Sequence, residues 1–140
     1  MSHDIEPLGF LRTCIDRRFV EASRRKFEEA TGLLPVAYWH EAYAGGSARD
    51  PSLVANDAKT GNNIYADQYA AEHGATVFGW QAHIDTCGGL PGANNTEIVK
   101  ALDEHIRAMI AKYPNSLHYR ILASNSGIEI TRVHPGFAKL

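Results

Sequence analysis

Both cysteines of this 140-residue chain lie in short clusters of polar side chains. The first cluster, CIDRR, holds Cys14, Asp16 and Arg18, and the second, HIDTCGG, holds His83 and Cys87 much later in the chain. Thiolates and imidazoles are ligands that zinc prefers, usually four of them in a tetrahedron. Three protein ligands, Cys14, His83 and Cys87, would leave the fourth position to a water, which is typical of a catalytic zinc site.

Asp16 and Arg18 would act beside that fourth position. Asp16 stands two residues after Cys14, so along an extended strand both side chains would point the same way. Asp16 could then ligate the zinc itself or hydrogen-bond the bound water. Arg18 could pair with Asp16, keep its carboxyl group ionised and set its direction. Zinc lowers the pKa of bound water to about 7, so the site would hold a hydroxide at neutral pH.

Other readings of the same residues stay open. Asp16 and Arg18 could form a purely structural ion pair. Cys14 or Cys87 could be the nucleophile of a thiol enzyme without metal, with His83 as its base. Two further residues are less favoured as parts of the site. We expect Asp85 to be a turn residue that caps its own backbone. His40 would at most be a reserve ligand or a proton shuttle.

Apolar runs alternate with helical patterns along the chain, and the alternation predicts the fold. The apolar runs predict strands over residues 8–15, 33–43, 75–83 and 116–124, followed by a half-exposed edge strand over 128–134. Helical spacing predicts helices over 16–32, 61–74 and 96–113, the last preceded by Asn95. This order indicates an α/β domain with a mainly parallel sheet of four strands, an antiparallel edge strand and helices on both faces.

Such a fold would bring the two clusters together. In open α/β sheets, ligand sites form outside the carboxyl ends of the strands. Cys14 would end the first strand, His83 would end the third, and Cys87 would lie just beyond it. If those two strands are neighbours in the sheet, the clusters meet at one edge.

Length and composition fit a single domain over residues 1–140. Apolar residues make up 44% and charged residues 21%, as in soluble globular proteins. The formal charge of -2 gives no basic field for nucleic acid or an anionic membrane. No run approaches the ~20 apolar residues that span a bilayer, and the amino-terminal residues do not resemble a signal peptide. We therefore expect a cytoplasmic protein whose cysteines are thiols or metal ligands.

The motifs together resemble those of the β-class carbonic anhydrases. CIDRR (14–18) matches the family's C-x-D-x-R signature, and HIDTCGG (83–89) is similar to its H-x-x-C-G motif. EAYAGGSA (41–48) is similar to the glycine turn that the family carries between them. The order of all three motifs agrees with the family, and the resemblance extends over roughly residues 8–133.

The resemblance implies a zinc site and a reaction. Cys14, His83 and Cys87 would bind zinc, and Asp16 with Arg18 would form the family's dyad. That dyad orients a zinc-bound hydroxide, or releases Asp16 to cap the zinc in a closed form. The implied reaction is the hydration of carbon dioxide to bicarbonate.

The resemblance also implies how the pocket and the assembly are built. Gly45, Gly46 and Gly88 would let the backbone approach the substrate pocket closely. The family is built on dimers, so a homodimer or a larger homo-oligomer is expected, with a small molecule as the only other partner.

The chain departs from the family pattern in three places. His83 and Cys87 are one residue further apart than in the family motif, and aligning Gly79 with the family's glycine puts Trp80 at the histidine position. The segment before Cys14 is shorter than the family's helical arm, and the glycine turn lacks its Arg-Asn pair. These departures keep two alternatives open: a non-catalytic or degenerate zinc- or ligand-binding paralogue, and a hydrolase of a related molecule such as carbon disulfide or carbonyl sulfide.

Overall fold

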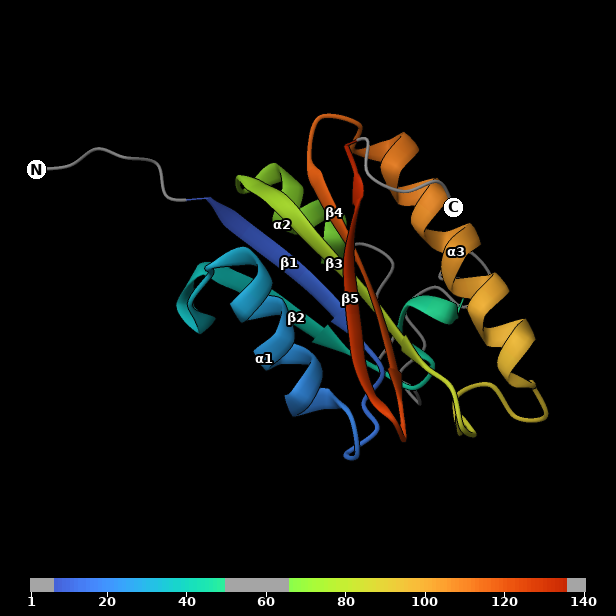
Figure 1. Ribbon diagram of the computed structural model, residues 1–140. Helices are drawn as coiled ribbons and strands as arrows, with labels where there is room; N and C mark the ends of the chain where they lie inside the picture. Colours follow the sequence, from blue (N-terminus) through green and yellow to red (C-terminus); the bar gives the residue numbers. More distant parts are fainter. Residues whose placement is uncertain (1–6, 50–65, 136–140) are drawn as a thin grey trace, which may run out of the picture.

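The computed structural model describes residues 7–49 and 66–135, which build one five-stranded sheet (Figure 1). The strands are β1 (Leu8–Thr13), β2 (Tyr38–Ala42), β3 (Ala75–His83), β4 (Leu117–Ser124) and β5 (Gly127–His134). Their order across the sheet is β2-β1-β3-β4-β5. The first four strands in this order run parallel, and β5 pairs antiparallel with β4 at the edge. The fold class predicted from the sequence is confirmed.

The pairing of β1 with β3 is the feature that matters for the site. Phe10 of β1 lies opposite Phe78 of β3, and Arg12 lies opposite Trp80. Because the two strands are parallel neighbours, their carboxyl ends reach the same edge of the sheet. The sequence predicted that the two clusters meet if these strands are neighbours, and they are neighbours.

Helices cover both faces of this sheet (Figure 1). The helices are α1 (Val20–Thr31), α2 (Ala66–Glu72) and α3 (Asn95–Lys112), with single 3₁₀ turns η1 (Pro35–Ala37) and η2 (Gly46–Ala48). On one face α1 buries Phe27 in a cluster with Leu11 of β1. On the other face α3 buries Leu102 in a cluster with Phe10, the neighbour of Leu11 along the strand. Successive residues of β1 thus serve opposite layers, as the pleat of a strand requires.

Local signals explain most element boundaries. Helix α3 begins with a reciprocal capping box, in which the Asn94 side chain accepts from the Glu97 backbone and the Glu97 side chain accepts from the Asn94 backbone. Asn95, expected just before the helix, is its first residue. Helix α1 ends at Gly32, whose φ of 75° is left-handed. The strand predicted from residue 33 begins only at Tyr38, because Pro35 opens a 3₁₀ turn there. Residues 61–65 of the helix predicted over 61–74 lie outside the described residues.

One buried ionic cluster was not foreseen from the sequence. Arg12 has no exposed surface, although it stands in the middle of an apolar run. Its guanidinium donates to Glu41 at 2.7 Å and to Asp67 at 2.9 Å, and one of its nitrogens lies 3.1 Å from His105 Nε2. The cluster therefore ties β1 to β2, α2 and α3. A buried charge is tolerated because it is paired in this way.

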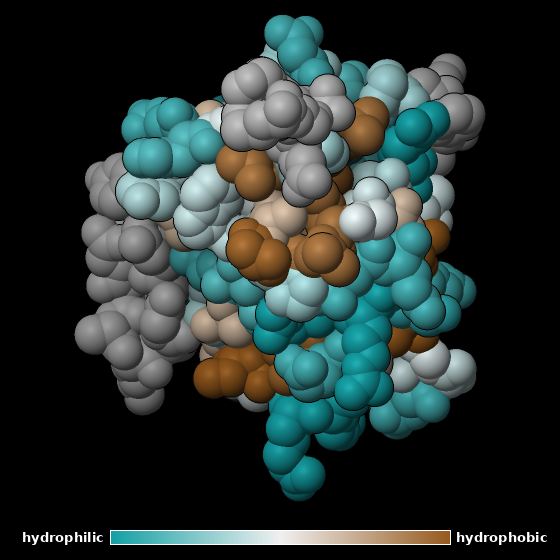
Figure 2. Space-filling model, turned by 90° about the vertical axis from the view of Figure 1, so that its left-hand side faces the viewer, coloured by the Kyte–Doolittle hydropathy of each residue, from teal (hydrophilic) through white to brown (hydrophobic). Residues whose placement is uncertain are grey.

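Exposed apolar side chains gather at the end of the sheet where β1 and β2 begin. Leu34 is 67% exposed and Val36 is 88% exposed. Figure 2 shows this side of the molecule, where apolar side chains are grouped among polar ones. Among the helices of the described residues, none combines the length and the apolar character needed to cross a bilayer.

Candidate metal centre

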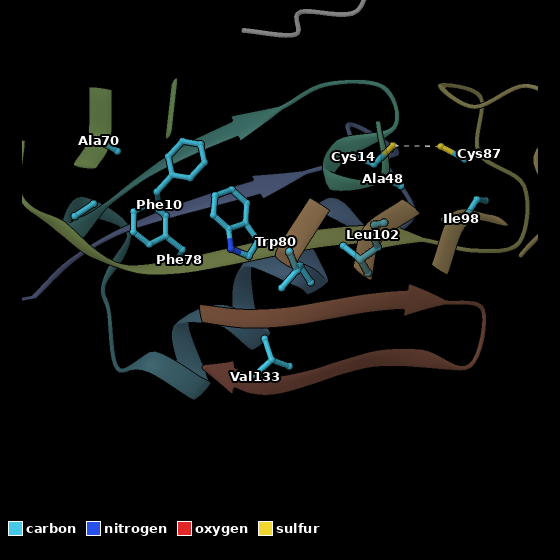
Figure 3. Close-up of a cluster of buried hydrophobic side chains, with 13 residues drawn as sticks. Phe10, Cys14, Ala48, Ala70, Phe78, Trp80, Cys87, Ile98, Leu102 and Val133 are labelled. Carbon is cyan, nitrogen blue, oxygen red and sulfur yellow. Dashed lines mark hydrogen bonds between the residues drawn. The ribbon is translucent and has the colours of Figure 1, made fainter. Parts of the chain in front are cut away.

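The fold brings three donor groups together beyond the carboxyl ends of β1 and β3. Cys14, His83 and Cys87 are all buried, and their ligand atoms lie within 4.8 Å of one another. The Sγ atoms of Cys14 and Cys87 face each other at 4.0 Å, at the end of the apolar core (Figure 3). The two sequence clusters thus converge as expected, and both cysteines are free thiols.

The position of Cys14 is fixed by the strand beside it. The backbone N–H of Cys14 donates to Gln81 Oε1 at 2.8 Å, and the Gln81 amide donates to Ser23 Oγ at 2.9 Å. Gln81 has no exposed surface, so this chain of hydrogen bonds has no competition from solvent. Gln81 was not singled out from the sequence, although a glutamine within the apolar run ATVFGWQAH was a signal of a buried polar role.

The ring of His83 presents a free nitrogen to the two sulfurs. Its Nδ1 lies 3.0 Å from the carbonyl oxygen of Ile84, so Nδ1–H donates to that carbonyl and Nε2 of the neutral ring keeps its lone pair. Burial opposes the charged ring, but Cys14, the Ile84 carbonyl and Asp16 outweigh it and raise the pKa of His83. Nε2 is buried and has no hydrogen-bond partner among the described residues. A buried nitrogen with an unused lone pair, grouped with two thiols, is the donor set that zinc binds. The residues present therefore fit a zinc ion.

The connection from His83 to Cys87 accommodates its additional residue by a left-handed turn. Asp85 has a φ of 66° and Thr86 a φ of 72°, a region in which residues other than glycine are uncommon. The His83–Cys87 spacing is one residue longer than in the family motif, so the loop must bulge if both side chains are to reach one metal ion. The left-handed turn is this bulge. Trp80, the alternative position for the ligand, is fully buried in the core and donates its Nε1–H to His118 Nδ1 at 3.0 Å.

Asp16 and Arg18 form an ion pair at the edge of the centre. Arg18 donates from Nη2 to Asp16 Oδ2 at 2.9 Å and from Nε to Oδ1 at 3.1 Å. These bonds lower the pKa of Asp16 from its ordinary 3.8 to about 2, so its carboxyl group stays ionised well into the acidic range. Asp16 Oδ2 lies 3.5 Å from His83 Nε2. The carboxylate is thus beside the donor atoms while Arg18 holds it.

The two thiols have different acidities because each affects the other. A hydrogen bond from Cys87 outweighs the opposing effect of burial and lowers the pKa of Cys14 to about 4, with further contributions from His83 and then from the Gly45 N–H. The same hydrogen bond and burial raise the pKa of Cys87. Without a metal the pair therefore shares one proton, with the thiolate on Cys14.

The glycine turn of residues 45–46 lies against Cys14. The Gly45 N–H is directed at Cys14 Sγ, with 3.4 Å between nitrogen and sulfur. A Cβ on Gly46 would lie 2.5 Å from the backbone nitrogen of Cys14. The sequence expected a third close approach at Gly88, but a Cβ there would meet nothing within 4 Å. That expectation is wrong: the close approach belongs to Gly89, whose Cβ would collide with the backbone of Ala44 and Gly45.

Two further polar residues near the clusters have roles of their own. Asp85 does not cap its own backbone as expected, because its Oδ2 accepts from the Asn125 N–H at 2.8 Å, in the turn between β4 and β5. His40 Nε2 lies 2.8 Å from Thr13 Oγ1 and is not a member of the three-residue donor cluster. Burial lowers the pKa of His40 to about 4, assisted by Arg24.

Comparison with known proteins agrees with this fold. No protein-family model matches the chain, and no curated protein is similar to it in sequence. Among solved structures it is similar to one of two tetrameric β-carbonic anhydrases from the filamentous ascomycete Sordaria macrospora. The superposition covers 94% of this chain and 83% of the fungal chain, with a TM-score of 0.50 and 13% sequence identity. The likeness shows that the chain has the β-carbonic anhydrase fold.

Proposed function

We propose that this protein is a zinc enzyme that hydrates carbon dioxide to bicarbonate. The observation that carries the proposal is the buried Nε2 of His83, which has no hydrogen-bond partner among the described residues and lies within 4.8 Å of both cysteine sulfurs. Asp16 Oδ2 lies 3.5 Å from this nitrogen, beyond a good hydrogen bond, so a bound cation would supply the close partner that Nε2 lacks. The fold shared with β-carbonic anhydrases supports the same conclusion.

Each residue of the centre has a role in this proposal. Cys14, His83 and Cys87 hold the zinc, which supplies a water whose pKa is low enough to act as a nucleophile at neutral pH. Asp16 accepts a hydrogen bond from the attacking water and directs its lone pair at the carbon of carbon dioxide. Arg18 keeps Asp16 ionised and directed at the centre, through the bonds that lower its pKa.

The glycine turns shape the space for the substrate in this proposal. Carbon dioxide is small and apolar, so its pocket needs close backbone walls and few polar groups. Gly45 and Gly46 supply one such wall beside Cys14, where there is no room for a Cβ on Gly46. Gly88 is exposed on the loop after Cys87.

Elemental analysis of the purified protein tests the ligand set first. We expect about one zinc per chain in the wild type and a loss of zinc in His83→Ala, Cys14→Ala and Cys87→Ala. Circular dichroism shows whether each variant remains folded. Stopped-flow hydration of carbon dioxide then tests the reaction, with Asp16→Asn expected to keep zinc and lose activity. A folded variant that retains stoichiometric zinc removes its residue from the ligand set.

A non-catalytic zinc-binding paralogue with the same ligands is the second candidate. The observation that favours it is the departure of the His83–Cys87 loop from the family spacing, which requires two left-handed residues. Protein with one zinc per chain and no hydration above the uncatalysed rate would support this candidate. The same preparation should be assayed with carbon disulfide and carbonyl sulfide, whose hydrolysis begins with the same nucleophilic attack on a central carbon.

We also propose that the chain forms a homo-oligomer in the cytoplasm. The similar fungal enzymes are tetrameric. The apolar patch that includes Leu34 and Val36 would be covered by a second copy. Free thiols at the centre fit a reducing compartment. Light scattering should give a mass above one chain for the wild type and a monomer for Val36→Asp, and a monomeric wild type would contradict the proposal.

A further inference from the structure

The loop between His83 and Cys87 has a conformation that its own residues do not favour. Asp85 and Thr86 are both left-handed, with φ values of 66° and 72°. Aspartate tolerates this region, but a β-branched threonine is an outlier there, so the turn is strained. The conformation persists only if neighbouring groups hold it. The groups that hold it therefore also set the position of Cys87.

The side chain of Asp85 connects the loop to two rigid elements. Its Oδ2 accepts from the Asn125 N–H at 2.8 Å, in the turn that joins β4 to β5. Its backbone N–H donates to Asn95 Oδ1 at 2.9 Å, and the Asn95 amide donates to Asp85 Oδ1 at 3.4 Å. Asn95 is the first residue of α3. The carboxylate thus links the loop to the end of the sheet and to the start of the longest helix.

Arg18 holds the same loop from its other side. Its guanidinium donates to the Thr86 carbonyl at 3.0 Å and to the Asp85 carbonyl at 3.3 Å, in addition to Asp16. The backbone of the left-handed turn is therefore held between Arg18 and the partners of the Asp85 carboxylate. His83 needs no such support, because it belongs to β3 and pairs with Ala123 of β4.

We infer that Asp85 is a positioning residue of the metal centre: its carboxylate holds the left-handed turn that places Cys87 within reach of Cys14 and His83. The inference rests on the proposed zinc centre and goes beyond it, since Asp85 is outside the three-residue donor cluster. Asp85 compensates for the additional residue between His83 and Cys87. Its loss lets the turn relax, moves the Cys87 sulfur away from its place 4.0 Å from Cys14 Sγ, and weakens metal binding.

Three substitutions separate the hydrogen bonds of Asp85 from its backbone conformation. Asp85→Asn keeps an acceptor for the Asn125 N–H and tolerates a positive φ. Asp85→Gly removes the acceptor and also removes the steric cost of the left-handed conformation. Asp85→Ala removes the acceptor and adds steric cost. The matched control is Asp103→Ala, which removes a carboxylate that accepts from Arg120 at 2.7 Å, away from the loop.

Cobalt binding to the metal-free protein measures the effect without any assay of activity. Titration with Co²⁺, followed by thiolate-to-metal charge-transfer absorption, gives the affinity, and thermal unfolding of the metal-free protein gives the stability. We expect affinity about tenfold weaker in Asp85→Gly and Asp85→Ala. Asp85→Asn should bind within about twofold of the wild type, since its acceptor is retained. Asp103→Ala should lose some stability and no affinity.

Three results would contradict the role of Asp85, each for a different reason. Wild-type affinity in Asp85→Gly would overturn the inference, whatever Asp85→Ala does, because it would show that the hydrogen bonds are not needed. Equal weakening by Asp103→Ala would also overturn it, because the effect would then follow general stability. A wild type that binds no cobalt would overturn the metal centre itself, and with it the role of Asp85.

Discussion

Gly46 offers the sharpest test of how closely the glycine turn is packed against the metal centre. A Cβ on this residue would lie 2.5 Å from the Cys14 nitrogen, 2.7 Å from the Gln81 oxygen and 2.8 Å from the Thr13 carbonyl carbon. All three atoms belong to the backbone of β1, β3 or the residue that follows β1, so none can move aside by a side-chain rotation. Gly46→Ala must therefore displace Cys14 or the turn itself.

The free energy involved has two parts. The φ of Gly46 is 51°, and a left-handed conformation costs an alanine about 1–2 kcal/mol. Forcing a methyl group into a filled space costs typically about 1–3 kcal/mol more. The two parts together should lower the free energy of unfolding by about 2–5 kcal/mol. This is a large part of the ~5–15 kcal/mol by which a domain is stable.

Gly32→Ala is the matched control, because Gly32 has a φ of 75° and a Cβ there would meet nothing within 4 Å. It carries the conformational cost alone, so we expect a loss of about 1 kcal/mol and no change in metal content. Urea unfolding and elemental analysis of both variants give the comparison. A Gly46→Ala variant that is as stable as Gly32→Ala and keeps its full content of zinc would show that the turn is not packed closely against Cys14.

Three further predictions concern charges. Arg12→Met should cost about 1–3 kcal/mol in urea unfolding, because it removes the guanidinium from the buried carboxylate of Asp67, which keeps Lys112 Nζ at 3.0 Å and the Tyr113 hydroxyl at 2.6 Å. A loss within about 0.5 kcal/mol, that of an ordinary surface substitution, would contradict this. The pKa of His40 is lowered to about 4, so between pH 6.5 and 4 the unfolded chain binds a proton that the folded chain does not, and stability falls as the pH falls. His40→Gln should flatten that decline, and an unchanged slope would speak against the lowered pKa. Arg18→Lys keeps the positive charge but loses the two paired hydrogen bonds to Asp16. Carbon NMR should therefore show the pKa of Asp16 rising from about 2 towards its ordinary value of 3.8. An unchanged titration curve would mean that other groups lower this pKa.

The sequence by itself determined the elements and the chemical types of the donor groups. Hydrophobic periodicity and glycine stops are local signals, so β3 was predicted with its observed bounds, and the fold class followed from the order of the elements along the chain. The residue types in CIDRR and HIDTCGG were sufficient to predict the donor set, because cysteine and histidine are limited to few structural roles. The capping residue of α3 was missed by one position, since two asparagines stand together there.

Only the tertiary structure decided how the donor groups meet. The pairing of β1 with β3 joins Cys14 to the strand of His83, and the sequence offered this as a condition and not as a result. The left-handed turn at Asp85 depends on Asn95 and Asn125, which are distant in sequence and act through hydrogen bonds. Backbone dihedral angles of a loop are set by such remote partners, so no local pattern could predict them.

The same reason explains the other residues that the sequence misplaced. Gly89, and not Gly88, lies against the glycine turn, because two loops far apart in the chain touch there. Arg12 is buried because partners on three other elements surround it, although its place in an apolar strand gave no sign of them. Residue types and periodicity determine which elements form and which chemistry is available. The packing of those elements decides which side chains meet, because each such contact joins parts of the chain that local sequence does not relate.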